Sequence, residues 1–182
     1  MIKHGRGDTI ISMEQKRPSI KAGLWLALAI VAVAAVLSVM AFYNRLSFLV
    51  TLVPPFTVNH WFSYIGATFI AFYTPAFYYL KRRYKTHYQT FVRIHVFGNL
   101  LSIMLISIHF GWHEGKLGGI FQDPRTGLPL YIALLVMLVT GINLRFQVSR
   151  KWLKPSRFTH LSFMAAFYLI VFFHVLHGIG IA

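Results

Sequence analysis

The sequence predicts an all-α integral membrane protein, a bundle of five transmembrane helices. Of the 182 residues, 57% are hydrophobic and only 12% are charged, about half the charged share of a soluble domain. Five stretches free of charged residues approach or reach the roughly 20 residues that a helical span needs. These stretches cover residues 22–44, 58–80, 94–113, 128–144 and 158–178. We therefore expect one membrane domain over residues 21–182, surrounded by a lipid bilayer and preceded by a cytoplasmic polar tail over residues 1–20.

The first stretch begins AGLWLALAIVAVAAV and lacks a convincing small-residue cleavage site after it, so we expect it to stay as a membrane anchor. The segment that follows, RLSFLVTLVPPFTVNHW, is apolar but is interrupted by Pro54 and Pro55. We expect this segment to lie at the outer membrane surface without crossing. The second to fifth spans then form a four-helix core, to which the first adds one extra N-terminal helix.

The basic residues predict the orientation of these helices. With the N-terminus inside, fifteen of the eighteen Lys and Arg residues fall on the inner side, and only Arg45, Lys116 and Arg125 lie outside. The positive-inside rule therefore predicts an N-in, C-out topology. This topology accounts for the formal net charge of +14, so we expect no nucleic-acid partner. The predicted location is the cytoplasmic membrane of a bacterium or archaeon, with the N-terminus in the cytoplasm.

The candidate site consists of histidines, because the chain contains no cysteine. That absence excludes cysteine-ligated zinc, iron–sulfur clusters and covalent CxxCH haem attachment on this chain. The third span contains His95 and His109, and the fifth contains His160 and His174, fourteen residues apart in each case. Fourteen residues turn a helix through about 1400° and advance it by about 21 Å, so both histidines of a span face one side.

The third and fifth spans run in the same direction, so the sequence predicts two facing histidine pairs. His95 would lie level with His160 near the inner surface, and His109 level with His174 near the outer surface. Imidazole is an axial ligand of haem iron, and a flat apolar porphyrin can fill the space between helices. We therefore predict two non-covalent b haems as metal centres. A single buried histidine is as readily explained by hydrogen bonding between helices, but the repeated spacing favours haem.

Four further residues are candidate haem contacts. Gly98 follows His95 by about one turn and Gly111 lies just past His109, and a missing side chain there would let a macrocycle approach the helix. Arg93 and Arg157 lie near the inner surface, where haem propionates would need partners. The positive-inside rule also accounts for both arginines.

Two histidines leave the outer site open to alternatives. His113 could replace His109 as a ligand, and His113 and His177 could instead tune protonation or bind an outer metal or substrate. Simple interfacial placement is an equal alternative for both, and it is the expectation for His60 and His87. A quinone is a second candidate ligand, since the second span is rich in aromatic residues, although aromatic belts are common at membrane interfaces.

These residues also resemble those of a known family. The stretches RIHVFGN…SIHFGWHEG and RFTHLSF…FFHVLHGIG resemble the two haem-ligating helices of the cytochrome b subunit in quinol:cytochrome c oxidoreductases. The ligand-bearing third and fifth spans are also similar to the membrane domain of ferric reductases and NADPH oxidases. The resemblance implies that His95 and His160 bind the inner haem, and His109 and His174 the outer one. It also implies electron transfer. The chain departs from these families, because no PEWY-type quinol-site motif and no flavin or nicotinamide domain is found. We therefore expect it to need a redox partner subunit or a quinone as electron donor or acceptor.

The leading hypothesis is a respiratory electron-transport subunit, an oxidoreductase component without catalytic residues of its own. One alternative is the membrane component of an outer-surface ferric reductase, and another is an anchor subunit of a larger complex. A histidine-lined transporter is the alternative from a different class. Coupled transporters usually place acidic residues within their spans, whereas Asp8, Glu14, Glu114 and Asp123 all lie outside the predicted spans.

Overall fold

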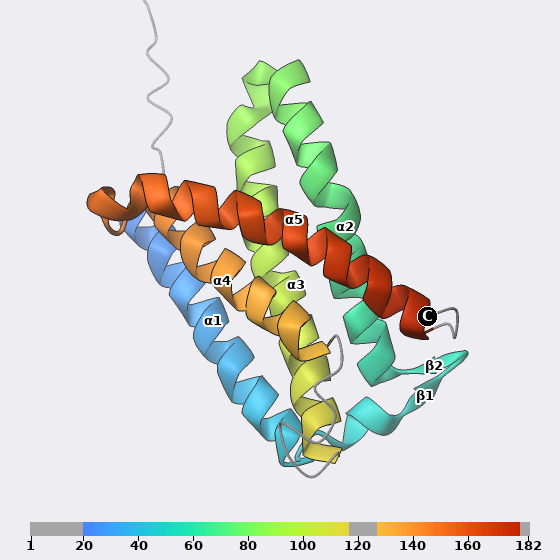
Figure 1. Ribbon diagram of the computed structural model, residues 1–182. Helices are drawn as coiled ribbons and strands as arrows, with labels where there is room; N and C mark the ends of the chain where they lie inside the picture. The colour runs from blue at the N-terminus through green and yellow to red at the C-terminus, as the bar shows by residue number, and fades with distance from the viewer. Residues whose placement is uncertain (1–19, 117–126, 179–182) are drawn as a thin grey trace, which may run out of the picture.

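The computed structural model describes residues 20–116 and 127–178, and most of these residues are helical. The described part contains five α-helices: α1 (Ile20–Phe42), α2 (Val58–Arg83), α3 (Tyr88–Lys116), α4 (Gly127–Phe146) and α5 (Leu153–Gly178) (Figure 1). The predicted all-α class and the number of helices are therefore confirmed. The helices at the basic end run past the predicted spans, because backbone hydrogen bonding continues beyond the uncharged stretch. Of the predicted polar tail over residues 1–20, only Ile20 lies within the described residues.

Four of these helices are long and apolar enough to cross a membrane, judged by length and composition: α1, α3, α4 and α5. Helix α2 has 26 residues and is long enough, but it does not reach the same hydropathy. Serine, threonine, tyrosine and proline residues within residues 62–80 lower the hydropathy of even its least polar stretch. A multi-pass membrane protein is thus supported, whereas the crossing by α2 and the N-in, C-out orientation stay predictions.

The apolar segment between α1 and α2 contains no long helix. It forms a short 3-10 helix, Ser47–Val50, and two short antiparallel strands, β1 (Leu52–Val53) and β2 (Phe56–Thr57). A cis peptide bond joins Pro54 to Pro55 between the two strands. The absence of a spanning helix in this described segment is what the two prolines predict, and its position at the outer membrane surface remains an expectation.

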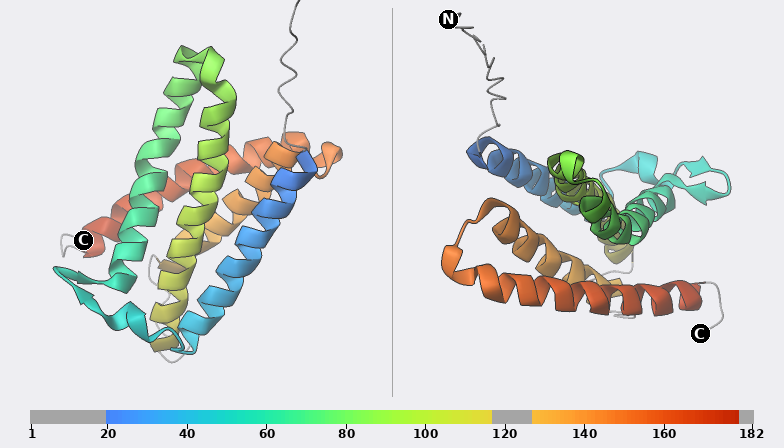
Figure 2. Two further views of the ribbon diagram at one scale, coloured as in Figure 1. Left: turned by 180° about the vertical axis from the view of Figure 1, so that it is seen from behind. Right: turned by 90° about the horizontal axis from the view of Figure 1, so that it is seen from above.

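The helices form two layers. Helix α3 packs closely against both α1 and α2, and α4 and α5 pack against each other as a hairpin. Seen from above, α1, α3 and α2 make up one layer and the α4–α5 hairpin makes up the other (Figure 2). Helix α5 crosses α3 obliquely and packs extensively only against α4. The two histidine-bearing helices therefore lie in different layers.

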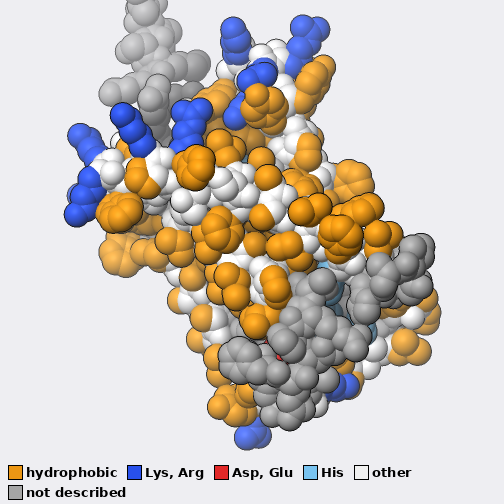
Figure 3. Space-filling model, viewed as in Figure 1, with side chains coloured by type: hydrophobic (Ala, Val, Ile, Leu, Met, Phe, Trp, Pro, Cys, Tyr) orange, Lys and Arg blue, Asp and Glu red, His pale blue; other side chains and the backbone are white. Residues whose placement is uncertain are grey.

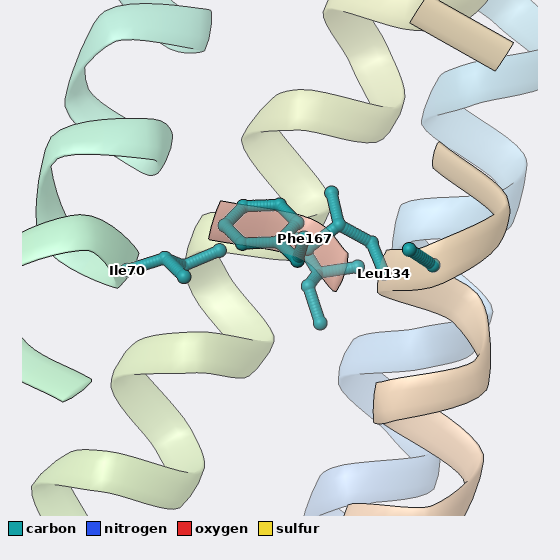
Figure 4. Close-up of a cluster of buried hydrophobic side chains, with 5 residues drawn as sticks. Ile70, Leu134 and Phe167 are labelled. Atoms are coloured by element: carbon teal, nitrogen blue, oxygen red, sulfur yellow. The ribbon is translucent and has the colours of Figure 1, made fainter. Parts of the chain in front are cut away.

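A buried apolar cluster connects the layers at mid-height. It consists of Ile70, Ile103, Ala133, Leu134 and Phe167, which come from α2, α3, α4 and α5. Figure 4 shows the Phe167 ring between Ile70 and Leu134, and only 1% of Phe167 is exposed. Phe167 lies midway in sequence between His160 and His174, so this cluster separates the two histidines of α5.

The surface matches a lipid environment. Many large apolar side chains point outward, among them Phe158 at 75% and Phe72 at 74% exposed, and hydrophobic side chains cover much of the face in Figure 3. Exposure of this extent marks a membrane or interaction surface. Lys and Arg side chains gather mainly at one end of the molecule, where α2 and α4 end and α3 and α5 begin.

Candidate functional site

The predicted inner pair comes together from α3 and α5. His95 and His160 are close enough for an electrostatic interaction between their side chains, and both are partly buried. The His95 ring also stacks on Phe77 of α2, with ring centroids 4.3 Å apart and 12° between the ring planes. This stacking holds one face of the imidazole against α2.

The His160 ring is held by α4. Its Nδ1 atom lies 3.1 Å from the Met137 carbonyl oxygen and 3.0 Å from Thr140 Oγ1. The Thr140 hydroxyl donates to the Val136 carbonyl at 2.7 Å, and a carbonyl oxygen can only accept. The proton therefore resides on His160 Nδ1, which leaves the Nε2 lone pair available as a metal ligand. Gly141 supports this position, since a Cβ atom there would lie 3.3 Å from His160 Cε1.

The predicted outer pair also comes together. His109 and His174 are close enough to interact electrostatically. The His109 Nδ1 atom donates to the Asn59 carbonyl oxygen of α2 at 3.2 Å, so this ring too presents Nε2 as the unprotonated nitrogen. The His174 side chain is exposed near the C-terminal end of α5.

Two more described histidines surround the outer pair. The ring centroid of His60 lies 5.9 Å from that of His109, and the ring centroid of His113 lies 5.4 Å from it. His113 is exposed and interacts electrostatically with His60 and His174. His177 belongs to α5, but its side chain lies outside the described residues. The described part of the chain thus gathers four histidines from three helices where α2 begins and α3 and α5 end.

No group of three or more described histidines or acidic residues is arranged to hold a metal ion. A protein-only cage for zinc usually supplies three or four ligands. Haem differs, because the porphyrin provides four of the six iron ligands and the protein adds only two axial ones. Each of the two histidine pairs has the two ligands that haem iron would require from the protein.

The four candidate contact residues lie as follows. A Cβ atom at Gly98 would clash with the Phe69 ring of α2, and one at Gly111 would clash with the Ser38 carbonyl of α1. Each glycine therefore has a helix-packing role, and its predicted haem contact is untested. Arg93 and Arg157 are both exposed at the basic end.

Several site residues were missed from the sequence. Asn99, which lies near His95, follows it by four residues, and that helical spacing could have identified it. Asn59, Thr140 and Gly141 reach the histidines from other helices, and no spacing rule within one span finds them.

Within the described residues, a cavity of about 80 Å³ lies between α1, α3 and α4. Its lining is mostly apolar and includes Ser107 and Tyr131. The cavity is smaller than the roughly 300 Å³ at which ligand pockets begin, and so gives the predicted quinone no preformed site. Comparison of the chain with protein-family models, curated proteins and solved structures finds no match. A functional assignment therefore depends on the histidine geometry.

Proposed function

We propose that the chain is a membrane di-haem cytochrome b, which carries electrons across the bilayer between two bis-histidine b haems as a subunit of a respiratory or quinone-linked redox complex. One observation carries the proposal: α3 and α5 each contribute one histidine to two pairs, and both pairs lie within electrostatic range. Haem, when bound, supplies reversible one-electron chemistry, and two axial histidines leave no open iron position for a substrate.

The residues present fit this cofactor. His109 and His160 each hold the Nδ1 proton against a backbone carbonyl, which is the usual second interaction of a metal-ligating histidine. Helix α5 packs extensively against α4 but not against α3. A flat apolar group between the histidines of α3 and α5 would therefore replace little direct helix packing.

The basic end supplies candidate partners for the propionates. Arg93 near the start of α3 and Arg157 near the start of α5 are exposed. Arg93 precedes His95 in sequence, and Arg157 precedes His160. We propose that they bind propionate carboxylates, as arginines often do for planar anions. We also propose that Gly98 and Gly111 contact the haems. The space for such contacts is narrow, because α2 packs beside Gly98 and α1 packs beside Gly111.

The outer histidine cluster favours a second candidate, the membrane component of an outer-surface ferric reductase. His60 and His113 lie beside the proposed outer ligands, where they could bind an external metal substrate. A histidine-lined transporter has less support, because Glu114, the one acidic residue in the described part of the chain, lies in the last turn of α3.

The test is the haem content of the protein purified in detergent. We expect reversible low-spin b-type spectra on dithionite reduction and two haems per chain by pyridine haemochrome assay. Folded protein without haem, expressed with adequate haem supply, would contradict the proposed function and promote the transporter.

A further inference from the structure

We propose that Asn59 and Asn99 are positioning residues for the two haem ligands of α3, each accepting a hydrogen bond from the Nδ1–H of one histidine. Asn59 would orient His109 and Asn99 would orient His95. This inference rests on the proposed function, because it assigns the two asparagines a role toward bound haem.

The geometry at His109 identifies the proton donor. Asn59 is fully buried and approaches the ring twice, with its carbonyl oxygen 3.2 Å and its amide Nδ2 3.1 Å from His109 Nδ1. The carbonyl can only accept, so His109 Nδ1 carries the proton. The Nδ2 amide group would then be a second donor facing the same proton, and neither group could accept from the other.

The side-chain amide resolves this conflict by turning over. Asn59 Oδ1 is buried and has no hydrogen-bond partner in the described part of the chain, an expensive state for a buried acceptor. Oxygen and nitrogen of an amide are nearly isosteric, and hydrogen bonding decides which faces a neighbour. With Oδ1 toward His109, the orphaned acceptor gains the Nδ1–H as its donor, and the Nδ2 group no longer faces that proton.

Asn99 repeats the arrangement at the inner site. It lies one turn after His95 on α3, and its Nδ2 atom is 3.4 Å from His95 Nδ1. Its Oδ1 is likewise buried and without a partner among the described residues. Turning this amide gives an Nδ1–H to Oδ1 hydrogen bond and leaves His95 Nε2 unprotonated, which is the form that binds iron.

At His160, a backbone carbonyl and a hydroxyl group hold the Nδ1 proton in place of an asparagine. These groups belong to Met137 and Thr140. His95, His109 and His160 thus each have an Nδ1 acceptor, and each of the two on α3 has its own asparagine. Such an acceptor makes an imidazole more electron-rich, and so favours ferric over ferrous haem.

The test compares the midpoint potentials and low-spin EPR g values of both haems in the purified full-length protein and its variants. N99L, a near-isosteric loss of the acceptor, should raise the potential of one haem and weaken binding of that haem by about 10- to 100-fold. N59L should raise the midpoint potential of the other haem by less, because the backbone carbonyl of residue 59 still accepts a hydrogen bond from His109 Nδ1. N99D, which adds an anionic acceptor, should lower the potential that N99L raises.

Asn143 provides the matched control. It is partly buried on α4 and hydrogen-bonds Ser156 and the Ser149 backbone, but neither candidate ligand on α3. N143L should lower stability and leave both potentials and g values unchanged. Equal shifts in N143L and N99L, or a shift of the same haem by N99L and N59L, would overturn the proposal.

Failure of the underlying function would look different. A wild-type chain without haem would overturn the proposed function and the asparagine roles together. A wild-type chain with two haems, combined with unshifted N99L and N99D, would overturn the asparagine roles alone. If N99L does not bind haem, N99D decides between these outcomes: a lowered midpoint potential supports the role of Asn99, and an unchanged or raised one overturns it.

Discussion

An imidazole becomes a useful axial ligand only when its second nitrogen is fixed. In His109 and His160 that nitrogen is tied to a backbone carbonyl of a different helix, and His95 is stacked on Phe77. The ring planes are thus set by α2 and α4, which carry no proposed ligand. Under the proposed function, substitutions in these two helices should therefore alter a haem that they do not ligate.

Under the proposed function, replacing His95 by leucine should reduce the haem content from two per chain to one, because the inner site would lose one of its two axial ligands. His160→Leu should give the same result. The double variant should lose no more than either single one, since both act on one site. The measurement is a pyridine haemochrome assay, with the exposed His87 replaced by leucine as control. Loss of both haems in His95→Leu with retained folding would contradict separate sites.

At the outer site, His109 and His113 are alternatives that haem content can separate. His109 is partly buried beside Asn59, whereas His113 is exposed. His113→Leu should therefore keep two haems per chain, and His109→Leu should keep one. The reverse result would make His113 the ligand and would remove the basis for the role of Asn59.

At the level of helices, close contacts to α3 depend on small residues. Gly111 lies against the Ser38 carbonyl, whereas no atom of the described residues lies within 4 Å of a Cβ position at Gly127. We expect Gly111→Ala to destabilise the folded protein by about 1–3 kcal/mol through overpacking, as measured by unfolding in SDS micelles. Gly127→Ala is the control and should cost less than this. Equal effects would show that the α1–α3 contact is not tight.

The mid-height cluster should be the most sensitive apolar position between the layers. Phe167→Ala removes a fully buried ring that contacts α2 and α4 residues, and we expect it to cost about 3 kcal/mol. The same unfolding assay measures this cost. Leu169→Ala provides a control on the same helix, since 60% of Leu169 is exposed. A loss for Leu169→Ala as large as that for Phe167→Ala would contradict the central role of the cluster.

The sequence predicted the helices well, because an uncharged stretch of about 20 residues has few alternatives. The spacing from His95 to His109 also predicted their shared face, since the period of a helix is fixed. It could not predict that Asn59, fifty residues away, would lie against His109, because such contacts depend on how helices pack. The crossing by α2 was less predictable for another reason: its aromatic and polar residues suit an interface as well as a bilayer.

For the whole molecule, the orientation in the membrane is open to a direct test. The chain contains no cysteine, so single cysteines can be introduced without background. In intact cells, Arg45→Cys should react with a membrane-impermeant maleimide, and Lys151→Cys should react only after the cells are broken. Both positions are exposed. The opposite labelling pattern would reverse the predicted N-in, C-out topology.

The cluster around Phe167 also has an electrical consequence. It places an apolar, weakly polarisable layer between two proposed sites about 21 Å apart along a helix, and most of the membrane voltage would fall across such a layer. A charge that traverses the full voltage gains or loses about 2.3 kcal/mol per 100 mV. Under the proposed function, passage of an electron between the sites would therefore be electrogenic. The energised state of the membrane would then favour one direction of flow and oppose the other.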